Sequence, residues 1–205
     1  MPLLEEEVRY DGAVKKMERL GLAGLVQEVR DALTSFRLEV SEVRHANSAA
    51  AIREMIDRAF SEVGGWTKTT SGDVDWRKCR VTGDVQLCVG VEVQISARSD
   101  LLVMDVIHLR DALENGDIDL AVIVVPSDEL AYFLVDRAPS LSAATRHVTS
   151  ARAEDLPILI LPFKHDGPGA ALPKRRTNRG RLPTTDNIVT DDALPEVDGE
   201  EPEPE

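Results

Sequence analysis

The sequence contains little of what would mark a secreted or membrane-bound protein. Only two of its 205 residues are cysteine, so it has no disulfide-rich framework. Its longest apolar run, Leu120 to Val125, is far shorter than the roughly 20 residues of a membrane-spanning helix. The first residues are acidic and lack a basic segment followed by an apolar one. We therefore expect no signal peptide, no membrane contact and a cytoplasmic location.

Basic residues are outnumbered by acidic ones. The formal net charge is −13, so any phosphate-binding surface must be a local patch on an acidic protein. Within the segment 165–205, every lysine and arginine falls in 174–181, and acidic residues dominate after it. Proline, glycine and charge are frequent in this segment, so we expect a largely disordered tail that is first basic and then acidic.

Apolar spacing predicts an α/β fold, a mixed β-sheet flanked by helices. The clearest helix has apolar residues at i, i+3, i+4, i+7, i+8 and i+11 along residues 48–63. Helices are expected at 12–33, 48–63, 100–114, 127–136 and 140–151, and Gly21 breaks the first of them. A short extended piece is expected at 36–40 and a hairpin at 73–96. Buried strands are expected at 118–125 and 158–161. The expected organisation is an N-terminal helical segment (1–45), a core (46–164) and the tail (165–205).

Two carboxylates are expected to face each other across the hairpin. Gly83 and Asp84 suit a two-residue turn, because glycine accepts positive φ at the first central position. Counting outward from this turn sets Asp75 opposite Glu92. Like charges directly opposite each other destabilise a sheet, and a bound cation would remove that cost. The pattern therefore suggests a divalent metal site.

Strand alternation adds a third polar group to this pair. Glu92 and Gln94 share one strand face with Asp75, while the apolar residues between them face the core. Two carboxylates and an amide are oxygen donors suited to Mg²⁺ or Mn²⁺. The alternative is an exposed polar strand face, on which Arg77 or Arg98 bridges the two carboxylates.

The two cysteines, Cys79 and Cys88, face each other in the same hairpin. A cross-strand disulfide and a pair of metal thiolates are both possible, but none of the four histidines has ligand spacing to them. In a cytosolic chain we expect two reduced, partly buried thiols.

The segment Val74 to Lys78, followed by Val91 to Gln94, resembles the signature of PD-(D/E)xK nucleases. More narrowly, it is similar to the type II restriction endonucleases that cut GATC-centred sites and carry Glu-x-Gln in place of Glu-x-Lys. The resemblance covers roughly residues 48–135. It implies a restriction-endonuclease-like fold over the core.

The resemblance also implies roles for individual residues. Asp75 and Glu92 would coordinate Mg²⁺, with Mn²⁺ as a substitute, and the carbonyl of Val93 would be a further ligand. Gln94 would orient the attacking water. The spacing from Asp75 to Glu92 is longer than expected of the family, but a longer hairpin absorbs the difference. Asp84 is nearer to Glu92 in sequence, yet it lies in the turn, and we reject it as a ligand.

The implied activity is hydrolysis of double-stranded DNA by a homodimer at a palindromic site, leaving 5′-phosphate and 3′-hydroxyl ends. Ser96 and Arg98, after the second hairpin strand, and Arg137, in a loop, are candidate DNA contacts, although each also suits a surface salt bridge. Glu54 is a candidate auxiliary residue or a solvated glutamate. The rival functions are a non-specific or repair nuclease of the same fold and a non-catalytic binding or regulatory protein.

Overall fold

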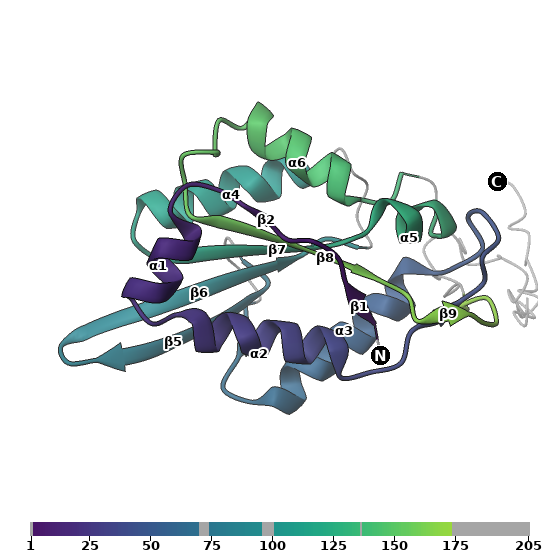
Figure 1. The fold of residues 1–205 in the computed structure, drawn as a ribbon, viewed down its shortest axis with the longest axis horizontal. Coiled ribbons are helices and arrows are strands. Elements are labelled where there is room, and N and C mark those ends of the chain that lie inside the picture. Colours follow the sequence, from purple (N-terminus) through teal and green to yellow (C-terminus); the bar gives the residue numbers. More distant parts are fainter. Residues whose placement is uncertain (1, 70–73, 96–100, 136, 174–205) are drawn as a thin grey trace, which may run out of the picture. The chain divides into compact units, whose positions relative to one another are not determined.

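The structure is a computed structural model, and it describes residues 2–69, 74–95, 101–135 and 137–173. Helices and strands are interspersed along the chain, as expected of an α/β fold (Figure 1). The helices are α1 (Ala13–Arg19), α2 (Ala23–Thr34), α3 (Ala49–Val63), α4 (Leu102–Glu114), α5 (Asp128–Phe133) and α6 (Leu141–Ser150). The strands are β1 (Leu3–Leu4), β2 (Val8–Arg9), β3 (Glu39–Val40), β4 (Thr67–Lys68), β5 (Trp76–Thr82), β6 (Val85–Val93), β7 (Leu120–Pro126), β8 (Ile158–Lys164) and β9 (Gly167–Pro168).

Within the described residues, seven strands form the main sheet. Its order is β1-β8-β7-β6-β5-β4, and β2 also pairs with β8. Strands β6, β7 and β8 are parallel to one another, whereas β5 is antiparallel to β6. The sheet is therefore mixed, as the sequence predicted. Two further short strands, β3 and β9, form a separate parallel pair.

Helices cover both faces of this sheet. Figure 1 shows α2 and α3 on one side of the strands and α4 and α6 on the other. Two apolar cores result, and alternate residues of β7 enter them: Val122 and Val124 enter one, Ala121 and Ile123 the other. Burial on both faces explains why β7 is an unbroken apolar run. No helix in the described part of the chain is long and apolar enough to cross a membrane.

The predicted hairpin register is confirmed. The ladder pairs Thr82 with Val85 at the turn and continues without a bulge to Trp76 and Val91. Gly83 has a φ of +62°, the conformation for which a glycine was expected in the turn.

The long helices and buried strands lie where apolar spacing placed them, with ends that differ by a few residues. The two-residue strands β1, β2, β4 and β9 were not predicted, because two residues are too few to show alternation. Strand β9 lies at the start of the segment expected to be a disordered tail. Through β1 and β2 the N-terminal segment joins the same sheet as the core residues.

Candidate active site

The β5–β6 hairpin brings the two predicted carboxylates together at its inner end. Asp75 directly precedes β5, and its backbone N–H donates to the carbonyl of Val91 and to Oε2 of Glu92, each over 3.1 Å. In the opposite direction, the N–H of Val93 donates to Oδ2 of Asp75 over 2.8 Å. Each carboxylate thus accepts a hydrogen bond from the backbone of the other segment. These contacts fix both side chains.

The residue after Asp75 anchors this end of the hairpin to helix α3. Trp76 is buried, and its ring stacks on Phe60 with the centroids 5.3 Å apart. Such pairs contribute about 0.5–1.5 kcal/mol beyond the area they bury. The indole N–H of Trp76 donates to Oδ1 of Asp57 over 3.2 Å. Phe60 contacts the face of the Trp76 ring and Asp57 binds its indole N–H, so the backbone beside Asp75 has a fixed position.

Glu92 and Gln94 are both buried, with 9% and 6% of their surface exposed. This burial contradicts the alternative of an exposed polar strand face. Burial is the largest influence that raises the pKa of Glu92 well above its ordinary range, and the charges of Asp75 and Asp105 add to it. The site disfavours a second negative charge, so a bound cation would stabilise it strongly.

Gln94 follows β6 and links Glu92 to helix α4. Its Nε2 donates to Oε1 of Glu92 over 2.9 Å and also to Oδ2 of Asp105. Burial raises the pKa of Asp105 to about 6, with nearby His108 acting against the shift and the charge of Asp75 adding to it. The Oε1 atom of Gln94 is buried and has no hydrogen-bond partner among the described residues. The amide nitrogen is committed to two carboxylates, which leaves this oxygen as an unused acceptor.

A cation from helix α3 completes the cluster. The guanidinium of Arg53 donates from Nη2 to Oδ1 of Asp75 over 2.6 Å and from Nη1 to the carbonyl oxygen of Val93 over 2.7 Å. Its Nε donates to Oδ1 of Asp57 over 3.1 Å. Burial acts to lower the pKa of Arg53, but the hydrogen bond and the charge of Asp75, with the charge of Asp57, outweigh it and raise that pKa. Arg53 therefore remains charged inside the site.

Sequence reasoning did not identify Arg53 or Asp105. Asp105 carried a usable signal, because it lies among Leu102, Val106 and Leu109 on the stripe of α4 that enters the core. A carboxylate on a core-facing stripe needs a polar partner, and the neighbouring Gln94 provides one. Arg53 carried no such signal, since an arginine beside an apolar stripe is common on amphipathic helices.

Of the two bridging cations named in the alternative interpretation, Arg77 lies in the described part of the chain. Arg77 does not bridge the carboxylates; it contacts Sγ of Cys88 over 3.4 Å. Arg98, like Ser96, lies outside the described residues. Arg137 is exposed in the connection between α5 and α6, with a φ of +62°. Glu54 is exposed on α3, next to Arg53.

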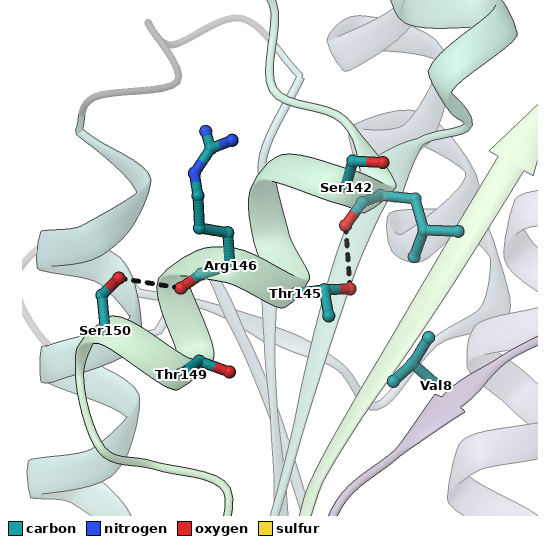
Figure 2. A pocket seen from close by; sticks show the side chains of 7 residues that line it. Val8, Ser142, Thr145, Arg146, Thr149 and Ser150 are labelled. Atoms are coloured by element: carbon teal, nitrogen blue, oxygen red, sulfur yellow. Dashed lines mark hydrogen bonds between the residues drawn. The ribbon is translucent and has the colours of Figure 1, made fainter.

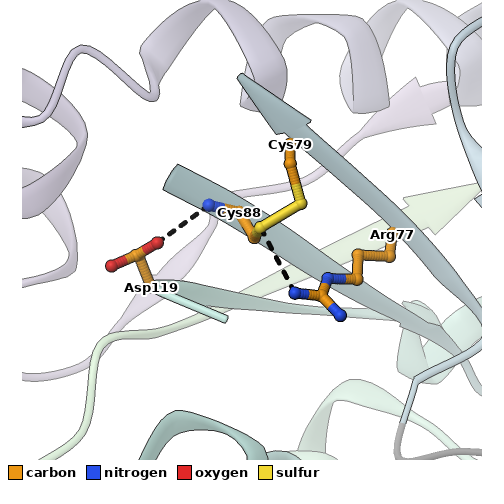
Figure 3. The surroundings of a disulfide bond; sticks show 4 residues. All are labelled: Arg77, Cys79, Cys88 and Asp119. Carbon is orange, nitrogen blue, oxygen red and sulfur yellow. Dashed lines mark hydrogen bonds between the residues drawn. A yellow bond between two sulfur atoms is a disulfide. The ribbon is translucent and has the colours of Figure 1, made fainter. Parts of the chain in front are cut away.

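The expectation of two reduced thiols is wrong in this structure, where Cys79 and Cys88 form a disulfide across the hairpin (Figure 3). The confirmed register sets the two residues directly opposite each other, and Cys88 is 4% exposed. The backbone N–H of Cys88 donates to Oδ2 of Asp119 over 2.8 Å, at the start of β7. The disulfide links the two strands at the middle of the hairpin ladder, apart from the carboxylates.

A surface pocket beside α6 contains none of the predicted site residues. It is lined by Val8 and by α6 residues that include Ser142 and Arg146 (Figure 2). The hydroxyls of Thr145 and Ser150 donate to backbone carbonyls of their own helix, as Figure 2 shows. The predicted site residues in the described part of the chain gather at the hairpin instead, apart from Glu54 and Arg137.

The donor set at the hairpin suits a hard divalent cation. Oδ1 of Asp75 and the carbonyl of Val93 already converge on one positive group, the guanidinium of Arg53. Glu92 lies beside them, and the unused Oε1 of Gln94 is an acceptor for a bound water. In the described residues no group of three or more His, Cys, Asp or Glu side chains has metal-binding geometry. The set found here relies on a backbone carbonyl as its third oxygen.

The mixed sheet and the paired carboxylates on its hairpin define a protein with a restriction-endonuclease-like fold. A family model described as restriction endonuclease BglII/BglIII matches residues 10–161. The chain belongs to this family: it is a type II restriction endonuclease, which hydrolyses phosphodiester bonds of DNA at specific sites. Among curated proteins, none matches the sequence significantly.

Proposed function

We propose that this restriction endonuclease is a Mg²⁺-dependent homodimer that cuts a palindromic site in double-stranded DNA. The proposal rests on two hydrogen bonds that run in opposite directions between the segment of Asp75 and that of Glu92 and Val93. The N–H of Asp75 donates to Glu92, and the N–H of Val93 donates to Asp75. These bonds place two acidic side chains and a backbone carbonyl at one end of a rigid hairpin.

Each residue of the site has a proposed role. Asp75, Glu92 and the carbonyl oxygen of Val93 would hold the metal, which when bound polarises the phosphate, lowers the pKa of a water and stabilises the leaving oxygen. Gln94 is neutral, so it orients the attacking water through Oε1 rather than taking its proton. The two carboxylates that accept from Nε2 of Gln94 keep this amide in place. Hydrolysis would leave 5′-phosphate and 3′-hydroxyl ends.

Digestion of a long DNA with the purified protein and Mg²⁺ tests the activity. We expect discrete fragments whose ends share one palindrome, and the resemblance of the hairpin segments favours GATC at its centre. Asp75→Ala and Glu92→Ala should each reduce cleavage at least about a thousandfold, because each removes a ligand of the metal that stabilises the transition state. Binding of the same DNA in Ca²⁺ or EDTA should largely survive.

The matched control is Asp84→Ala. It removes the same charge from the same hairpin, but at the exposed turn. This variant should cleave at the wild-type rate. Full cleavage by Asp75→Ala would contradict the proposed site, and a continuous smear of fragments from the wild type would contradict site-specific cutting.

Two further properties are proposed on the family assignment. A palindrome has two-fold symmetry, and a homodimer places one hairpin site against each strand. Light scattering of the purified chain should give twice the mass of one chain. A cytoplasmic location is the expectation for an enzyme whose substrate is double-stranded DNA inside the cell.

A further inference from the structure

The guanidinium of Arg53 occupies the space where two of the proposed ligand oxygens converge. It bridges Oδ1 of Asp75 and the carbonyl of Val93, at 2.6 and 2.7 Å. A divalent cation held by these same two oxygens would overlap the guanidinium. The side chains of Arg53 and Asp75 are only 20% and 22% exposed, so water screens this ion pair weakly.

Arg53 has a second partner that does not belong to the metal site. Its Nε donates to Oδ1 of Asp57, one turn further along α3. Asp57 is itself fixed by Lys68 and by the indole of Trp76. A guanidinium that releases Asp75 and Val93 therefore still has a counter-charge in Asp57.

We propose that Arg53 is a built-in competitor of the metal, a positioning residue that holds Asp75 and Val93 ready for a cation and must leave them for the metal to bind. The proposal rests on the proposed function, since it assigns Arg53 a role at that site. It follows from competition for shared atoms: the metal and the guanidinium cannot both use Oδ1 of Asp75 and the carbonyl of Val93. The release of Arg53 is then part of the cost of metal binding.

Competition and a purely structural role of Arg53 predict opposite changes in metal affinity when Arg53 is removed. If Arg53 only held Asp75 in place, its removal would weaken metal binding. If Arg53 competes, its removal strengthens metal binding. A charged hydrogen bond contributes about 1.5–3 kcal/mol, so the Kd should fall roughly ten- to hundredfold.

The test is titration of the full chain with Mn²⁺ in the absence of DNA, with free Mn²⁺ followed by its electron paramagnetic resonance signal. Arg53→Met should bind Mn²⁺ roughly ten- to hundredfold more tightly than the wild type. Arg53→Lys keeps the charge but reaches fewer oxygens, so its Kd should lie between those of the wild type and Arg53→Met. Arg58→Met is the matched control, because it removes the same charge from an exposed position of the same helix. Its Kd should equal that of the wild type.

Thermal unfolding gives a second measurement that does not depend on catalysis. Arg53→Met should melt at a lower temperature than the wild type in EDTA, because Asp75 loses its counter-charge. Saturating Mn²⁺ should raise its melting temperature more than that of the wild type. If Arg53→Met is too unstable to purify, Arg53→Gln retains a hydrogen-bond donor without the charge and carries the same expectations.

The outcomes separate this inference from the proposed function. Equal or weaker Mn²⁺ binding by both uncharged variants, with clear binding by the wild type, overturns the competition and leaves the metal site intact. If neither the wild type nor Arg53→Met shows Mn²⁺ binding that Asp75→Asn removes, the metal site itself is wrong. Tighter binding by Arg53→Met, lost again in Arg53→Met with Asp75→Asn, supports both.

Discussion

The middle and the inner end of the β5–β6 hairpin share one register but differ in the pairs that face each other across it. At the middle of the ladder, Cys79 and Cys88 are joined by a disulfide. At the inner end, the acidic side chains of Asp75 and Glu92 meet, and the second of them is buried. The disulfide stabilises the middle of the hairpin, whereas the inner end keeps an electrostatic cost that a cation can remove. Substitutions at these two places should therefore separate stability from activity.

The largest expected effect on stability is at the disulfide. Replacing Cys79 and Cys88 by serine opens a loop of about ten residues and should lower the free energy of unfolding by about 2–3 kcal/mol. Chemical denaturation of the oxidised wild type and the double variant measures the difference. The rate of DNA cleavage should not change, because the disulfide touches neither carboxylate. A large loss of cleavage in the folded double variant would show that the middle and the inner end of the hairpin are not independent.

A smaller effect of opposite sign is expected at Glu92. Glu92→Gln keeps the shape but removes a buried acid, so in EDTA it should raise the free energy of unfolding by about 1–2 kcal/mol at neutral pH. The pKa of Glu92 is raised in the folded state, so the folded protein binds the proton more tightly than the unfolded chain. Wild-type stability should then fall as pH rises from the ordinary pKa of glutamate toward the raised one.

The variant should lack this pH dependence, and it should also lose cleavage. Denaturation curves in EDTA across that pH range measure the first property, and digestion with Mg²⁺ measures the second. Identical pH profiles for the two proteins would mean that Glu92 is not held protonated by its surroundings.

The smallest expected effect is at the turn. Gly83 has positive φ, and nothing lies within 4 Å of the position that a Cβ would occupy. Gly83→Ala should therefore cost only about 1 kcal/mol, from backbone conformation alone. Thermal unfolding detects a change of this size, and cleavage should be unaffected. A cost near zero would indicate that the turn adopts another conformation.

The hairpin shows how much of the site the sequence contains. The turn residues determine the register, and the register brings Asp75 to Glu92, so both follow from local rules. Gln94 follows from alternation along β6. Local hairpin and strand geometry is enough to relate these three residues, and the structure places them in contact.

Other parts of the site depend on packing that no local pattern specifies. Arg53 reaches Asp75 only because α3 lies against this end of the sheet, and Asp105 reaches Gln94 only because α4 covers the other face. The bonding of Cys79 to Cys88 depends on redox conditions as well as proximity, so their facing positions alone did not decide it. Contacts between side chains of distant elements therefore could not be predicted from the sequence.

The proposed ligand Val93 has a consequence for genetic variation. Its side chain is buried in the core, while its carbonyl oxygen lies at the site. Every amino acid has that oxygen, so no substitution at position 93 can delete it, and only an apolar fit to the core selects the residue there. A screen of point variants would record position 93 as a packing position. One third of the proposed ligand set is thus hidden from mutation, and the enzyme can lose or change its metal only through Asp75, Glu92 and their neighbours.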